Sequence, residues 1–190
     1  MQGKRHCLCK LSLLVLSLCC LATLAAAPAQ AATAAEIDKD VDLAIEKLYA
    51  SSPVAKDLAT LAKGILVFPD VVKAGLIVGG QYGEGALRVG GKTVAYYNTA
   101  AASYGLQAGA QSFGYAMFLM TDDAMAYLKK SKGWEVGVGP TVVVMDEGLA
   151  KSLTTSTAKD DIYAFIFSQK GLMAGIGIQG SKITPFTPGQ

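Results

Sequence analysis

The chain has 190 residues, of which 52% are hydrophobic, and seventeen Lys/Arg against fifteen Asp/Glu give a formal net charge of +2. The only histidine, His6, and all four cysteines lie within the first twenty residues. Beyond that segment the sequence offers no imidazole base, no thiolate nucleophile, no disulfide and no His/Cys zinc site. This composition favours a binding function over catalysis.

The N-terminal segment has the three parts of a secretion signal. A positive region holds Lys4, Arg5 and Lys10, and an apolar stretch of fourteen residues follows at positions 11–24. Small residues then continue to position 32. We predict cleavage after Ala31, because Ala29-Gln30-Ala31 fits the A-x-A pattern of signal cleavage sites. The expected product is a periplasmic or secreted protein.

Two other outcomes for this segment stay open. An uncleaved membrane anchor is less favoured, because the apolar stretch is shorter than a typical transmembrane helix. Lipoprotein anchoring through Cys19 or Cys20 is also less favoured, since the residue before each is Leu18 or Cys19 and neither position holds a small aliphatic residue.

Loss of residues 1–31 changes the charge of the chain. It removes three basic and no acidic residues, which leaves fourteen against fifteen and a net charge of −1. No global positive field then remains to attract nucleic acid, so no nucleic-acid partner is expected. Residues 32–190 are long enough for one domain with a core that folds without disulfides.

Two helices are predicted next. Residues 34–50 carry apolar side chains at spacings of three and four, with acidic residues early in the segment. Ser52-Pro53 then reads as an N-cap followed by proline at the first helical position. The second helix is expected over residues 53–63, ending at Gly64.

Strand patterns fill most of the remaining sequence. A short apolar strand at 65–68 is expected to close at Pro69-Asp70, and Gly90-Gly91 predicts a hairpin turn. Thr121 is predicted to cap a helix that ends before Gly133. The other expected strands cover residues 74–82, 85–89, 93–98, 104–120, 134–138, 141–145, 162–168 and 172–178.

The connections between these strands are short, which favours antiparallel pairing. Glycine recurs inside the strands, where it allows the bends and bulges that a strongly curved sheet needs. We therefore predict an α+β fold, a curved antiparallel β-sheet or small barrel with packed N-terminal helices.

Several motifs that could signal chemistry have simpler interpretations. Residues 175–180 spell G-x-G-x-x-G, but Pro185 and Pro188 follow and no helix can open there, so a dinucleotide site is not predicted. Paired carboxylates at 122–123, 146–147 and 160–161 stand at helix starts or turns and suit caps better than glycoside hydrolysis. No metal site and no cofactor are predicted.

Serine chemistry would have to proceed without histidine. Ser168 and Lys170 could form a Ser–Lys dyad, and this hydrolase hypothesis stays open beside the interpretation of a surface turn. The lysines offer another hypothesis, since an amphipathic helix with lysines can lie on an anionic lipid surface. Lysines that merely keep the surface hydrated are the simpler alternative.

The order of several motifs resembles the SYLF domain family, also called Ysc84. The resemblance covers roughly residues 54–183 and rests on the segments Ala62–Pro69, Lys73–Gly75, Gly80–Gly85, Tyr104–Gly109 and Phe167–Leu172. The family pattern often has a Trp-Ser-x-Pro-like segment, for which this chain has Tyr97-Asn98-Thr99-Ala100.

The resemblance implies binding of anionic lipid without catalytic activity. Eukaryotic members bind phosphoinositides and other anionic lipids, and some bind actin, which does not carry over to a chain with a bacterial-type leader. The resemblance implies an anionic phospholipid or membrane surface as the partner, with Lys56, Lys63 and Lys73 as the lipid-binding residues. A periplasmic structural or protein-interaction module of the cell envelope, with an envelope protein as partner, remains the alternative.

Overall fold

Helices precede and cover an eight-stranded sheet in the computed structural model of the chain, which describes residues 32–76, 78–104, 109–130, 133–136, 138–145, 158–171 and 181–189. The helices in these ranges are α2 (Ala34–Ser51), α3 (Pro53–Leu61) and α4 (Asp122–Lys130). The strands are β1 (Gly64–Gly75), β2 (Val78–Val89), β3 (Lys92–Tyr104), β4 (Gly109–Leu119), β5 (Trp134–Glu135), β6 (Val142–Met145), β7 (Ile162–Gly171) and β8 (Lys182–Phe186).

Both N-terminal helices begin at capped positions. The Thr33 hydroxyl accepts a hydrogen bond from the Glu36 N–H, and the Glu36 carboxylate accepts one from the Thr33 N–H, which completes a capping box. Ser52 caps α3, whose first residue is Pro53, as predicted. The first helix is confirmed to within one residue, and the second ends at Leu61, two residues earlier than predicted.

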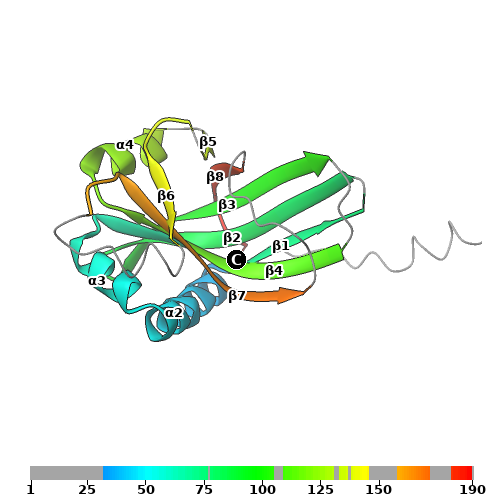
Figure 1. Ribbon diagram of the computed structural model, residues 1–190, viewed down its shortest axis with the longest axis horizontal. Helices are drawn as coiled ribbons and strands as arrows, with labels where there is room; N and C mark the ends of the chain where they lie inside the picture. Colours follow the sequence, from blue (N-terminus) through cyan, green and yellow to red (C-terminus); the bar gives the residue numbers. More distant parts are fainter. Residues whose placement is uncertain are drawn as a thin grey trace, which may run out of the picture. The chain divides into compact units, whose positions relative to one another are not determined.

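The strands form one sheet in the order β5-β8-β3-β2-β1-β4-β7-β6. The sheet is strongly curled into a half-barrel (Figure 1), which confirms the predicted α+β fold with a curved sheet. Every ladder is antiparallel except that of β6 with β7, which is parallel. The expectation of antiparallel pairing is wrong there, since Val142–Met145 run in the same direction as Ile162–Phe165.

Strand ends differ most from the prediction where glycine and proline were interpreted as breaks. The strand that begins at Gly64 does not close at Pro69-Asp70 but continues to Gly75, with a register shift at Pro69. A bulge tolerates proline because its backbone nitrogen needs no ladder partner. The turn falls instead around Leu76, inside the predicted strand 74–82. The predicted strand 172–178 lies outside the described residues.

Two apolar cores cover the two faces of the sheet. One core packs α4 residues against Leu66, Phe68 and Tyr115, and it draws in Trp134 from β5 and Ile162 from β7. The other packs the apolar stripe of α2 against Val67, Ala86, Ala116 and Phe165. We call these two sides the α4 face and the α2 face.

A polar clamp fixes the N-terminal half of α2 to the sheet. The Arg88 guanidinium donates to the Asp42 carboxylate at 2.7 Å and to the Asp38 carbonyl oxygen at 3.0 Å. The Asp38 carboxylate accepts hydrogen bonds from the hydroxyls of Thr93, at 2.6 Å, and Tyr96, at 3.1 Å. These contacts join α2 to β2 and β3 and so position one wall of the site described below.

Candidate functional site

The sheet extends beyond the region that α2 covers, and there its α2 face is exposed. Cross-strand partners share a face, so the pairings of Lys170 with Ser112, Ser112 with Val72, Val72 with Tyr82, Tyr82 with Ala100 and Ala100 with Lys182 define one row across six strands. This row has a lysine at each end and apolar side chains between them, apart from Ser112.

The same face stays apolar from this row to the β1–β2 turn. Its exposed residues are Val72, Ala74, Leu76, Val78, Gly80, Tyr82, Ala100, Ala102 and Ala110, and we call them the open face. Leu76 is 70% exposed and Val78 is 67% exposed, more than any other large hydrophobic residue in the described part of the chain. Contiguous exposed apolar surface of this kind marks an interaction site in soluble proteins.

Tyr82 is an amphipathic residue of the open face, with an apolar ring and a polar hydroxyl. Its hydroxyl donates to the Glu84 carboxylate at 2.7 Å. Burial, that hydrogen bond and the charge of Glu84 raise the pKa of Tyr82 to about 12, so the phenol stays neutral. A tyrosine with an apolar ring and an anchored hydroxyl suits a boundary between apolar and aqueous surroundings.

Along β1 and β2, the carboxylates nearest the β1–β2 turn lie in the row next to the open face. Asp70 and Glu84 are cross-strand partners there, and they are the last acids along β1 and the first along β2. Beyond them, residues 71–83, 99–113 and 169–183 contain three lysines and no aspartate or glutamate. In the part of the chain that the structure describes, this end of the sheet therefore carries lysines and no carboxylate, beside apolar and neutral polar side chains.

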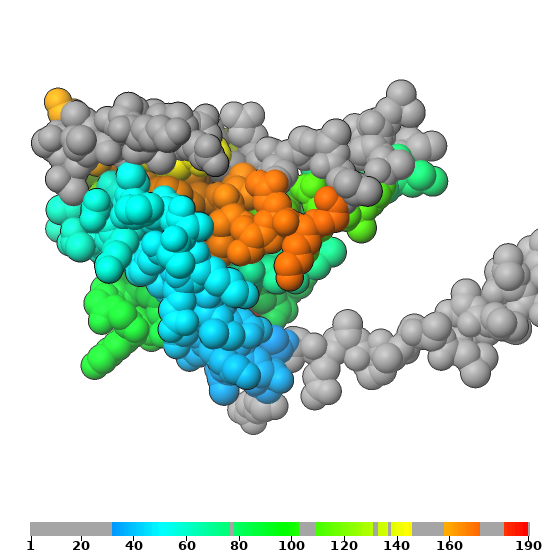
Figure 2. Space-filling model, turned by 60° about the horizontal axis from the view of Figure 1, so that its bottom comes forward, coloured from blue at the N-terminus to red at the C-terminus, as the bar shows by residue number. Residues whose placement is uncertain are grey.

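A groove of about 450 Å³ adjoins the open face, between α2 and the sheet. Figure 2 shows β7, in orange, running alongside α2, in blue to cyan. The groove is lined by residues of α2, β1, β4 and β7, namely Asp40, Leu43, Ala44, Lys47, Pro69, Asp70, Ser112, Gly114, Phe167, Ser168, Gln169 and Lys170. Its volume lies in the range of small-molecule sites. Ser112 and Lys170 belong to both the groove and the lysine-ended row.

Two β-bulges shape the groove. On β1, Pro69 and Asp70 stand opposite Gly114 alone. On β7, Ser168 and Gln169 stand opposite Phe113 alone. Ser168 adopts φ +53°, the one non-glycine residue in the described chain with a positive φ. Left-handed backbone at serine carries a local cost, and such residues cluster at functional sites.

Gly114 sets the depth of the groove floor. A Cβ at this position would lie 2.4 Å from Cε2 of Phe167, so the Phe167 ring occupies the space above the glycine. The two residues are cross-strand partners on the α2 face. The missing side chain thus lets an aromatic ring form part of the groove.

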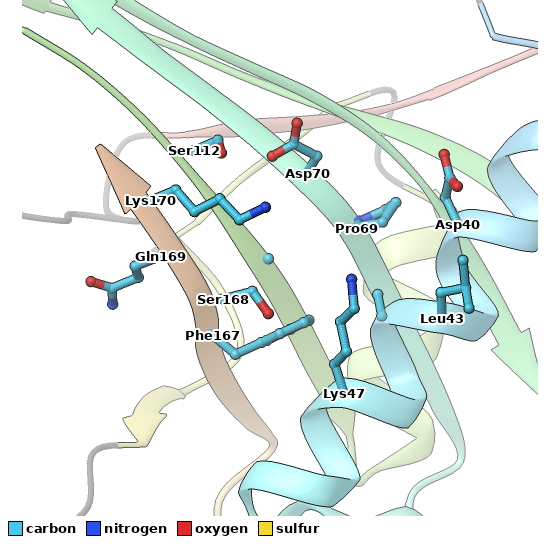
Figure 3. Close-up of a pocket in the computed structure, with 12 residues that line it drawn as sticks. Asp40, Leu43, Lys47, Pro69, Asp70, Ser112, Phe167, Ser168, Gln169 and Lys170 are labelled. Atoms are coloured by element: carbon cyan, nitrogen blue, oxygen red, sulfur yellow. The ribbon is translucent and has the colours of Figure 1, made fainter. Parts of the chain in front are cut away.

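Two ammonium groups enter the groove from different elements. Figure 3 shows Lys47 of α2 and Lys170 of β7 directing their side chains toward the same space, with the Ser168 hydroxyl beside them. Among the described residues, neither lysine takes part in a hydrogen bond or ion pair. Asp40 and Asp70 also line the groove, so its lining has two positive and two negative groups.

The structure separates the three lysines predicted to bind lipid. Lys56 lies exposed on α3, and Lys63 precedes β1 and forms a 3.8 Å ion pair with Asp122. Lys73 lies near the other end of β1, roughly 30 Å along the strand from Lys63 at the usual rise per residue. Lys73 pairs in register with Gln81 and Gln111, so it faces away from the open face. The predicted lipid-binding set did not include Lys47, Lys170 or Lys182.

The two residues of the hydrolase hypothesis, Ser168 and Lys170, lie near each other but share no hydrogen bond in the described structure. Both line one groove. Of the paired carboxylates, Asp122-Asp123 begin α4, as predicted. The Asp161 carboxylate accepts hydrogen bonds from the Thr141 N–H and hydroxyl, which lower its pKa, and from the Thr121 hydroxyl. The pair at 146–147 lies outside the described residues.

Neither a membrane-spanning helix nor a metal-binding cluster is present among the described residues. No helix there has the length and hydrophobicity to cross a bilayer. No group of three or more His, Cys, Asp or Glu side chains there is arranged to hold a metal ion.

Residues 100–187, from the end of β3 through β8, match the Ysc84 family model, which is described as "Las17-binding protein actin regulator". The match confirms the Ysc84 resemblance over residues 100–187. The matched segment includes Lys170 and Lys182 of the row and the β7 wall of the groove. The resembling motifs at 62–69, 73–75 and 80–85 precede it. No curated protein matches the chain significantly.

Proposed function

We propose that this chain is an exported, non-enzymatic domain that binds the surface of a membrane containing anionic phospholipid. The open face carries the proposal. It is apolar and exposed, Lys170 and Lys182 flank it, and the surrounding stretches of sequence hold no carboxylate. An apolar centre bordered by lysines suits a bilayer surface, where acyl chains lie beneath anionic headgroups.

The expected strength of this contact is modest. Each lysine next to an anionic surface contributes on the order of 1 kcal/mol, within a Debye length. Burial of apolar area on Leu76 and Val78 adds about 25 cal/mol per Å². Together these terms support reversible association and not stable anchoring. The lipid binding implied by the family resemblance supports the same proposal.

Vesicle co-sedimentation of the purified protein tests the proposal. We expect sedimentation with phosphatidylglycerol vesicles, little with phosphatidylcholine vesicles, and weakening as salt rises. The double variant Leu76→Gln/Val78→Gln should lose most of the binding with an unchanged melting temperature, because both side chains are exposed. Leu61→Gln/Val94→Gln is the matched control, since these exposed residues lie near the other end of the sheet.

A second variant examines the lysines predicted from sequence. Lys56→Gln/Lys63→Gln/Lys73→Gln should abolish sedimentation if those lysines form the cationic contact. Lys170→Gln/Lys182→Gln should abolish sedimentation if the lysine-ended row forms the cationic contact. Equal binding to both vesicle types, or full binding by the Leu76/Val78 variant, would contradict the proposal.

A further inference from the structure

The groove has two cationic side chains whose charges are not neutralised by contact. Lys47 and Lys170 come from α2 and β7, and each ammonium group lacks an ion-pair partner among the described residues. Both point into one space, beside the Ser168 hydroxyl (Figure 3). Two converging lysines and a hydroxyl match the oxygens of a phosphate group.

The same groove also holds two carboxylates. Asp40 and Asp70 line it, and neither forms an ion pair with a described residue. A bare phosphate would meet attraction from the lysines and repulsion from the carboxylates. A ligand that joins a phosphate to hydrogen-bond donors satisfies both sets, because carboxylates accept from hydroxyl groups.

The groove opens onto the open face. Lys170 and Ser112 line the groove, and they continue in register into Val72 and Tyr82 of the open face. With about 450 Å³ the groove is large enough for a headgroup and smaller than a whole phospholipid. Leu43 and Phe167 give its lining an apolar part. A bound lipid can therefore place its polar end in the groove and its acyl chains along the open face.

We propose that this groove is a headgroup site for a glycerol-bearing phosphodiester lipid of the phosphatidylglycerol type. Lys47 and Lys170 bind the phosphodiester, and the headgroup glycerol hydroxyls donate to Asp40 and Asp70. This inference rests on the proposed lipid binding and adds headgroup selection to it. Phosphatidic acid, which has a more highly charged phosphate and no headgroup hydroxyl, binds less well at equal mole fraction.

The local backbone supports a built site. The β7 bulge at Ser168, with φ +53°, places the serine hydroxyl in the groove, and the β1 bulge places Asp70 there. Gly114 leaves room for the Phe167 ring at the floor. Three separate irregularities of adjacent strands thus meet at one groove.

Charge variants in vesicle binding give the first test. Lys47→Gln/Lys170→Gln should lower affinity for phosphatidylglycerol vesicles by about thirtyfold, from two lysine contacts. Lys129→Gln/Lys130→Gln on α4 makes the same charge change away from the groove and should leave affinity unchanged. Asp40→Asn/Asp70→Asn should raise affinity for phosphatidic acid vesicles and so reduce or reverse the preference for phosphatidylglycerol. Thermal melts confirm that each variant is folded.

A soluble headgroup gives the second test, which needs no variant and no membrane. Glycerophosphoglycerol should shift the backbone amide NMR signals of Gly114 and Ser168 in the wild-type protein, and inorganic phosphate should shift them much less. Absence of those shifts, with full phosphatidylglycerol binding by the Lys47/Lys170 variant, would overturn the headgroup site while leaving membrane binding intact. Failure to bind any anionic vesicle would instead overturn the proposed function, and the soluble headgroup would still decide the groove.

Discussion

At the scale of single residues, Gly114 provides the most direct test of the groove geometry. A methyl group at this position would lie 2.4 Å from the Phe167 ring, which must then move. We expect Gly114→Ala to destabilise the protein by about 2 kcal/mol, as overpacked positions do. Denaturant unfolding followed by circular dichroism measures this change.

Gly80 is the matched control for that substitution. It is a strand glycine on the same face, and a Cβ there would find its nearest neighbour, the Ala101 carbonyl oxygen, at 3.9 Å. Gly80→Ala should therefore be neutral or slightly stabilising. If both variants unfold at the same denaturant concentration, the packing of Phe167 on Gly114 is not as described.

Individual site residues differ in how far the sequence could identify them. The absence of acids from residues 71–83, 99–113 and 169–183 is visible in the sequence alone, and it was the available signal for the cationic end. Lys47 and Lys170 are separated by more than a hundred positions, and only the packing of α2 beside β7 brings them together. The bulge at Ser168 depends on register and has no signature in local composition.

At the scale of elements, helix ends could be predicted because their signals are local. Ser52-Pro53 and the early acids of α4 determine where those helices start. Strand ends were harder to predict from the sequence. Pro69 and the strand glycines resemble the residues that end strands, whereas here they lie in bulges and in close cross-strand contacts. A Cβ on Gly85, for example, would lie 2.1 Å from the Val67 carbonyl oxygen.

The attachment of α2 is the element-scale feature most relevant to the groove. Arg88 makes two short hydrogen bonds to α2 while its side chain is only 11% exposed. We expect Arg88→Met to cost about 2 kcal/mol of stability, the range for hydrogen bonds to charged groups. It should also weaken phosphatidylglycerol binding, because α2 supplies the Lys47 wall.

The control for the clamp is Lys92→Met. Lys92 is an exposed residue at the start of β3, so its replacement should change neither stability nor vesicle binding. Urea unfolding and co-sedimentation of the two variants check both expectations. An Arg88 variant as stable as the wild-type protein would show that the clamp does not hold α2.

At the scale of the whole molecule, the curled sheet gathers short stretches that are distant in the sequence into one surface. Alternation and glycine content were enough to predict a curved sheet with N-terminal helices. They were not enough to predict the β5-β8-β3-β2-β1-β4-β7-β6 order, which places Lys170 and Lys182 at the two ends of one row. The order depends on long-range pairing, which local patterns do not encode.

The central claim is that the open face contacts the membrane, and site-directed spin labelling tests it most directly. All four native cysteines lie in the first twenty residues, so Leu76→Cys supplies the sole thiol of a protein prepared as residues 32–190. Val94→Cys, an exposed position near the other end of the sheet, is the control. On addition of phosphatidylglycerol vesicles, a nitroxide at position 76 should become shielded from a water-soluble nickel chelate and more accessible to oxygen, while one at position 94 stays in water. A label at position 76 that remains fully accessible to the chelate while the protein sediments with the vesicles would contradict this account.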